Sequence, residues 1–249
     1  MYKKLWLGFA LVVGLSFLVL GYFGYEIYTQ APPVPEQVCS IDGTTLFTGD
    51  DIREGQSVWQ SIGGQEVGSV WGHGAYVAPD WSADFLHREL VFILDRWAIA
   101  EGSENFSQLP AEKQAALKER LKQLIRKNRF DPSTKVLTVT SDEKSAIDEV
   151  SNHYAALFTG DPSQSKLREA YALQPRAVKD ATKMKQMAAF FYWTSWACAT
   201  NRPGSDVTYT NNWPPESLIG NAPTGSIVVW SVLSFVFLLA GIGALAWYF

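Results

Sequence analysis

The chain has 249 residues, of which 18% are charged and 47% belong to the hydrophobic set. This balance excludes an intrinsically disordered protein, because disorder requires few apolar residues and many charged ones. The net charge of −4 argues against nucleic acid as a partner, since phosphate binding needs a clustered basic excess. Its two cysteines, Cys39 and Cys198, build no zinc ribbon, iron–sulfur cluster or CxxCH haem-attachment motif.

The first apolar run covers residues 5–25 and carries no charge. Its length suits one crossing of a hydrocarbon core about 30 Å thick. Lys3 and Lys4 precede the run and Glu26 follows it, so the positive-inside rule places the N-terminus in the cytoplasm. The alternative is a cleaved signal peptide, but the run is long and no clear small-x-small cleavage site follows it. We therefore predict an N-terminal transmembrane anchor at residues 1–26.

We predict that residues 27–222 form one mostly helical domain outside the membrane. A stiff proline-rich spacer, APPVP, lies near its start at residues 31–35. Residues 43–74 are rich in glycine and are expected to be irregular. Residues 135–140, KVLTVT, are the one predicted strand. Apolar spacing and capping residues predict five helices, which begin near Pro79, Pro110, Ser141, Asp161 and Ala177.

The second apolar run, residues 227–249, also carries no charge and predicts a second membrane helix within residues 223–249. Trp230 and Trp247 suit the two interfaces of a bilayer. The alternative is a buried core helix of a soluble protein. Two crossings place both termini in the cytoplasm. Because the run ends without a polar flank, we expect the chain to continue in a longer polypeptide.

Few residues outside the apolar runs suggest chemistry. None of the three histidines lies in either run, so this chain offers no imidazole at membrane depth for a haem or copper site. They are His73, His87 and His153. His87 and Glu89 flank Arg88, but a metal site there lacks a third ligand. Cys39 and Cys198 fall near the two ends of the exported domain, and whether they form a disulfide stays open.

Two long stretches carry a family resemblance: residues 55–90, GQSVWQSIGGQEVGSVWGHGAYVAPDWSADFLHREL, and residues 190–219, FFYWTSWACATNRPGSDVTYTNNWPPESLI. Together they resemble the N-terminal region of quinol-dependent nitric oxide reductases. The resemblance covers nearly the whole chain and is loosest over residues 101–179. It implies a mainly α fold in which two transmembrane helices flank an extracytoplasmic cytochrome-c-like helical domain that lacks haem c.

The expected lack of haem c follows from comparison with the related small subunit of cytochrome-c-dependent nitric oxide reductases. That subunit has a W…CxxCH…GxGAYxAP pattern, whose frame remains here in Trp59 and in residues 72–79, GHGAYVAP. Counting back from GAY, Gly64, Val67 and Gly68 occupy the Cys, Cys and His positions. Covalent haem needs two thiols and an axial imidazole, so none is expected to be bound covalently. This suits an enzyme that takes its electrons from membrane quinol.

The resemblance further implies a catalytic membrane core, in the same polypeptide or in a separate subunit. That core belongs to the haem-copper oxidase superfamily and carries haem b, haem b3 and a non-haem iron on intramembrane histidines. It reduces two NO to N2O in denitrification or NO detoxification. The present chain would support and dock to it without contributing a catalytic residue. The alternative is a non-enzymatic, membrane-anchored interaction or assembly protein that keeps this scaffold.

One binding role is implied by the same resemblance. The GAY segment of the related subunit helps to hold a calcium between the haem propionates of the core. The matching ligands here are the carbonyl of Gly74 and Tyr76, and calcium prefers such oxygen ligands. The alternative is that Gly72 and Gly74 form a tight turn while Tyr76 packs or caps.

Overall fold

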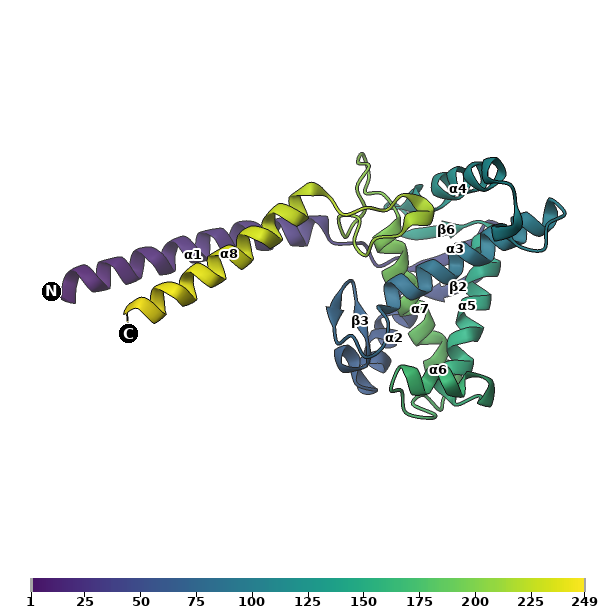
Figure 1. Ribbon diagram of the computed structural model, residues 1–249, viewed down its shortest axis with the longest axis horizontal. Helices are drawn as coiled ribbons and strands as arrows, with labels where there is room; N and C mark the ends of the chain where they lie inside the picture. The colour runs from purple at the N-terminus through teal and green to yellow at the C-terminus, as the bar shows by residue number, and fades with distance from the viewer. Residues whose placement is uncertain (1, 249) are drawn as a thin grey trace. The chain divides into compact units, whose positions relative to one another are not determined.

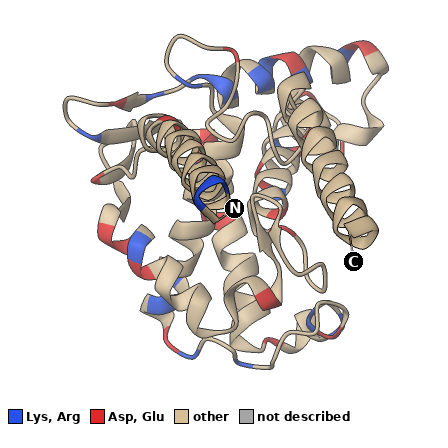
Figure 2. Ribbon diagram, turned by 90° about the vertical axis from the view of Figure 1, so that its left-hand side faces the viewer, with Lys and Arg blue, Asp and Glu red and all other residues tan. Residues whose placement is uncertain are grey.

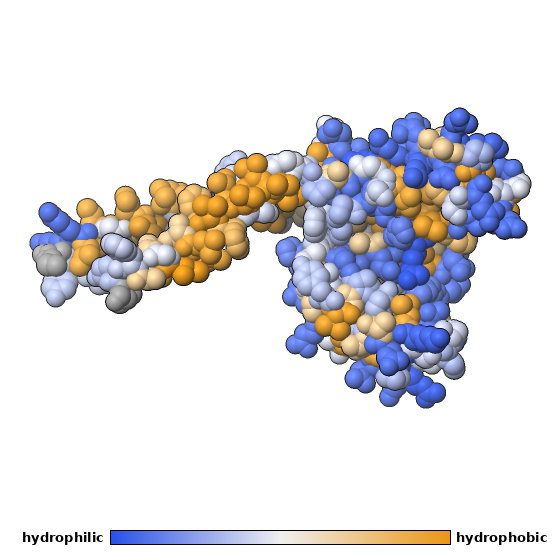
Figure 3. All heavy atoms as spheres, in the orientation of Figure 1, coloured by the Kyte–Doolittle hydropathy of each residue, from blue (hydrophilic) through white to orange (hydrophobic). Residues whose placement is uncertain are grey.

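The computed structural model describes residues 2–248, which divide into an N-terminal unit ending at Pro33 and a larger unit beginning at Val34. Helix α1 (Tyr2–Gln30) forms the first unit, and helix α8 (Gly225–Tyr248) ends the second. Both helices are long and apolar enough to cross a membrane and bury no residue. Figure 3 shows them mainly in orange and Figure 2 draws α8 without charged residues, as expected of a membrane protein.

The larger unit contains a small sheet that the sequence only partly predicted. Strands β1 (Gln37–Ser40), β2 (Thr45–Thr48), β5 (Phe130–Asp131) and β6 (Val136–Val139) lie in the order β2-β1-β6-β5. Strand β1 runs antiparallel to β2 and parallel to β6, where Val38 is opposite Leu137. The prediction at residues 135–140 is confirmed. Strands β1 and β2 were missed because QVCS has a single β-branched residue and TLFT buries two adjacent residues, so neither shows a clear alternation.

Helix α2 (Gly49–Ser61) lies where we expected irregular structure, so that prediction was wrong. A capping box begins the helix: the Thr48 hydroxyl accepts from the Asp51 N–H at 3.1 Å, and the Asp51 carboxylate accepts from the Thr48 N–H at 2.9 Å. The glycines of this helix allow it to pack closely against neighbouring backbone. A Cβ on Gly55 would overlap the backbone carbonyl of Gln186 on helix α7.

The predicted helices are found at α3 (Trp81–Ala100), α4 (Ala111–Arg126), α5 (Ser141–Thr159) and α7 (Ala181–Ala199). The N-cap of α5 is Thr140, one residue before the predicted start at Ser141. Asp161 begins only a 3-10 turn, followed by the short helix α6 (Ser165–Ala170). The shorter elements are η1 (Gly64–Val67), β3 (Ser69–Val70), β4 (His73–Gly74), η2 (Phe106–Gln108) and η4 (Ser217–Ile219).

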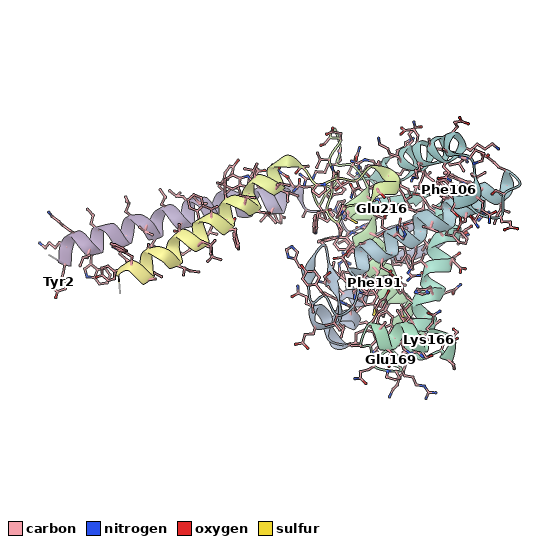
Figure 4. All side chains as sticks on the ribbon, viewed as in Figure 1. Tyr2, Phe106, Lys166, Glu169, Phe191 and Glu216 are labelled. Carbon is pink, nitrogen blue, oxygen red and sulfur yellow. The ribbon has the colours of Figure 1, made fainter. Side chains whose placement is uncertain are left out.

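The apolar core forms two clusters. The first lies among α2, α3, α5, α7 and the sheet and is strongly aromatic, with Phe191 of α7 at its centre (Figure 4). The second lies among α3, α4, η4 and the end of α7 and is mainly aliphatic, with Leu90, Leu121 and Ile219 fully buried. Both cysteines are free thiols, so the structure contains no bond between Cys39 and Cys198. The mainly α fold inferred from the sequence is confirmed.

Gly55→Ala tests the close contact between α2 and α7. The new methyl group has no room beside the Gln186 carbonyl, so the helices must separate. We expect a loss of about 3 kcal/mol of unfolding free energy, the upper range for overpacking. Thermal unfolding followed by circular dichroism measures it. Gln56→Ala, at the exposed neighbouring position, is the control and should change the stability little. Equal melting temperatures of the two variants would contradict the tight contact.

Candidate functional site

The segment of residues 62–80 holds the positions singled out by the resemblance, and Asp80 organises it. One Asp80 oxygen caps helix α3 by accepting from the Ala83 N–H at 3.0 Å. The other accepts from the Ser69 hydroxyl at 2.9 Å and from the Gly72 N–H at 2.6 Å. A single carboxylate therefore joins the start of α3 to the β3–β4 hairpin, and charge strengthens each of these hydrogen bonds.

Trp81, the next residue, connects the same segment to the aromatic core. Its side chain is fully buried and stacks on Phe191, with centroids 5.4 Å apart and planes at 16°. Tyr154 meets its edge at 5.9 Å. The indole N–H donates to the Val67 carbonyl at 3.1 Å, so the buried ring holds the segment with its one polar atom.

These contacts decide whether the cytochrome-c positions fit a haem. Gly68 has φ +120°, and a Cβ there would lie 2.5 Å from the Trp81 indole nitrogen and 2.8 Å from the Pro79 carbonyl. A side chain at Gly68 is therefore excluded by both backbone conformation and space. Val67 offers an apolar side chain and Gly64 offers none. Residues 64–68 thus do not fit a covalently attached haem c.

A second tryptophan fastens the hairpin to α7. The Trp71 indole N–H donates to the Thr194 carbonyl at 2.8 Å, and its ring lies 5.5 Å from that of Trp193. Next to it, a Cβ on Gly72 would overlap the indole of Trp213. The hairpin is therefore attached to α3 through Asp80 and to α7 through Trp71.

The two predicted calcium ligands lie at the end of this hairpin. Gly74 pairs with Ser69, has φ +146°, and leaves no room for a Cβ against the Gly68 carbonyl, while Gly72 lies in the turn between β3 and β4. Tyr76 is 91% exposed, so it does not pack against this chain. Among residues 2–248, no three or more His, Cys, Asp or Glu side chains are arranged to hold a metal.

His87 and Glu89 of helix α3 have different neighbours. The His87 Nδ1 atom lies 2.9 Å from a carboxylate oxygen of Glu216, in the segment that leads to α8 (Figure 4). Glu89 is only 4% exposed. Burial, and then the nearby Glu143, raise the pKa of Glu89 well above its usual range, while Arg129 opposes this. Sequence reasoning missed this buried acid. The periodicity of α3 was the signal that could have found it, because it places Glu89 on the inner face of the helix.

The comparison with protein-family models gives one match. Residues 35–215 match the NorB cytochrome c-like domain of nitric oxide reductase. The chain belongs to this family. No curated protein matches the chain closely enough to be reported as a relative. The match covers the sheet, helices α2 to α7 and the hairpin, and it associates the chain with the catalytic core of a nitric oxide reductase.

Glu89→Gln tests the buried carboxyl. A pKa raised in the folded protein means that the native state holds a proton that the unfolded chain has released. Stability is therefore fully present below the unfolded pKa of about 4.3 and falls as the pH rises toward the folded pKa. The amide cannot ionise, so the variant should lose this slope and be more stable than the parent at pH 7.5. Melting temperatures between pH 5 and pH 7.5 measure it.

The matched control for Glu89 is Glu149→Gln on the exposed face of α5, which should keep the parent slope. If Glu89→Gln and the parent show the same pH dependence, Glu89 is ionised in the folded protein.

Proposed function

We propose that this chain is the N-terminal part of a quinol-dependent nitric oxide reductase, in which it supports and docks the core that reduces two NO to N2O. The proposal rests on the Trp81 ring, which occupies the space that the side chain of a haem iron ligand at residue 68 would need. A cytochrome-c-like domain without haem c cannot relay electrons from a soluble cytochrome. The electrons must then reach the core by another route, and membrane quinol is the donor available to a protein with two apolar helices.

The proposed arrangement in the membrane places residues 27–222 on the periplasmic or extracellular side. Lys3 and Lys4 retain the N-terminus in the cytoplasm, and α8 returns the chain through the bilayer. The domain then lies over the outer face of the core. In this position it contributes no catalytic residue, and haem b, haem b3 and the non-haem iron belong to the core.

Calcium at the interface with the core is the second element of the proposal. Gly74 would contribute its carbonyl and Tyr76 its phenol oxygen, while the remaining ligands would come from the core. Two features support this: Tyr76 extends into solvent from a rigid hairpin, and Gly74 lies close against the Gly68 carbonyl, where no other residue would fit. An exposed aromatic ring on a fixed turn is suited to contact a partner.

The electron source is tested with the complete enzyme in proteoliposomes. We expect NO consumption with a reduced quinol as the only donor, and no stimulation by reduced cytochrome c. The purified 249-residue chain should give no pyridine haemochrome signal after acid-acetone extraction. Covalent haem in this chain, or turnover driven by cytochrome c alone, would contradict the proposal.

Tyr76→Phe separates calcium ligation from packing, because it removes one oxygen and keeps the ring. In the complete enzyme we expect less bound calcium and NO turnover lowered about tenfold, partly restored by added calcium, since one neutral oxygen ligand contributes only part of the affinity. Calcium is measured by atomic emission. Val77→Ala, at the exposed neighbouring position, is the control and should keep the calcium. Parent levels of calcium and turnover in Tyr76→Phe would refute the ligand assignment.

A further inference from the structure

A polar pocket of about 540 Å³ lies between helix α4 and the segment that precedes α8. Three basic side chains line it: Lys122, Arg126 and Lys127. Two acidic residues, Glu119 and Asp206, line it as well. Three positive charges against two negative ones leave a net charge of +1. The size is within the range of pockets that hold small ligands, roughly 300–1,000 Å³.

Arg126 is the half-buried base of this pocket, and its partners are neutral. One of its terminal nitrogens donates to the Asn221 side-chain oxygen at 3.1 Å. The other donates to the Asp206 backbone carbonyl at 2.6 Å and to the Asn212 side-chain oxygen at 3.3 Å. Among residues 2–248 no salt bridge includes Arg126; burial lowers its pKa, and the charge of the nearby Asp206 carboxylate opposes this. A partly buried guanidinium that no carboxylate contacts directly can still bind the oxygens of an anion.

The neighbouring groups also lack complete partners. Lys127 is exposed, and over residues 2–248 no carboxylate oxygen pairs with it. Lys122 makes only a long contact of 3.9 Å with Glu119. The side-chain oxygen of Asn201 is buried and has no hydrogen-bond partner. Because the oxygen and nitrogen of an amide exchange by a flip, Asn201 can present its NH2 group to an anion in the pocket.

The chain brings this pocket close to the membrane. Gly220 lines it and Arg126 binds Asn221, while α8 begins at Gly225. Five residues span at most about 18 Å, which bounds the distance from Gly220 to the helix. At 1.5 Å per residue α8 is about 36 Å long, more than the roughly 30 Å of a hydrocarbon core, so its first residues lie at the level of the lipid headgroups.

We propose that this pocket binds the phosphodiester headgroup of an anionic phospholipid. A phosphodiester carries one negative charge, which matches the net charge of the pocket, and guanidinium and ammonium groups are the usual partners of phosphate oxygens. Basic pockets beside membrane helices recognise such headgroups. The bound lipid would fasten the domain to the bilayer at the start of α8.

The test uses the full chain purified in mild detergent and native mass spectrometry to count retained lipid. Phosphatidylglycerol and phosphatidylcholine are offered in separate arms, and a third arm adds millimolar inorganic phosphate to the phosphatidylglycerol complex. We expect retention of phosphatidylglycerol and not of phosphatidylcholine. The double variant Lys122→Gln/Lys127→Gln should retain about thirtyfold less, because each basic residue near a membrane surface contributes roughly 1 kcal/mol.

The control variant Lys166→Gln/Lys179→Gln makes the same change of charge at two exposed positions outside the pocket and should retain the lipid (Figure 4). Melting temperatures of both double variants confirm that they are folded. Three results would overturn the proposal: equal retention by the two double variants, equal retention of the two lipids, or displacement of phosphatidylglycerol by inorganic phosphate. The last result would assign the pocket to free phosphate.

Discussion

The buried indole of Trp81 is the contact on which the domain depends. Its ring lies against Phe191 and Tyr154, so it joins α3, α5 and α7 in one aromatic cluster. Its N–H holds the Val67 carbonyl, which fixes the segment of residues 62–80 to that cluster. The same ring leaves no room for a side chain at Gly68. One residue thus fills the core, positions the hairpin and excludes a haem ligand.

An aromatic core of this kind would allow a cytochrome-c-like fold to persist without haem c, as we propose for this chain. A covalent haem supplies a large apolar surface against which helices pack. Here Trp81, Phe85, Phe158 and Phe191 bury comparable rings among the same helices, and each is at most 1% exposed. Aromatic side chains each bury roughly 150–250 Å² and stabilise one another at such centroid separations. We infer that the family scaffold keeps its shape through these rings and serves as a rigid support.

Much of this architecture was visible in the sequence, and what was missed had specific reasons. Helices α3 and α4 have long apolar periods and clear starts, so their prediction succeeded. Helix α2 was missed because its glycines, Gly49 and Gly55, suggested a loop, whereas they permit close packing. Strands β1 and β2 lack a clear alternation of apolar and polar residues, since β2 buries the adjacent Leu46 and Phe47.

The sequence singled out the segment of residues 62–80, but it did not indicate the contacts that shape this segment. The motif placed Gly64, Val67 and Gly68 at the haem-ligand positions, but no periodicity indicates that Trp81 excludes a side chain at Gly68. That depends on an interaction across 13 residues, which only the folded chain brings together. Likewise, the sequence did not predict that Tyr76 is exposed. It is an aromatic residue among apolar ones, and its exposure depends on the folded hairpin that precedes it.

The most direct test of the account is to restore the haem-attachment residues while keeping Trp81. The triple variant Gly64→Cys/Val67→Cys/Gly68→His would be expressed with a cytochrome c maturation system, and its covalent haem measured as the pyridine haemochrome. We predict no stoichiometric haem and a lowered melting temperature, because the imidazole at residue 68 has no room beside the indole. One covalent haem per chain in a folded protein of unchanged stability would contradict the account.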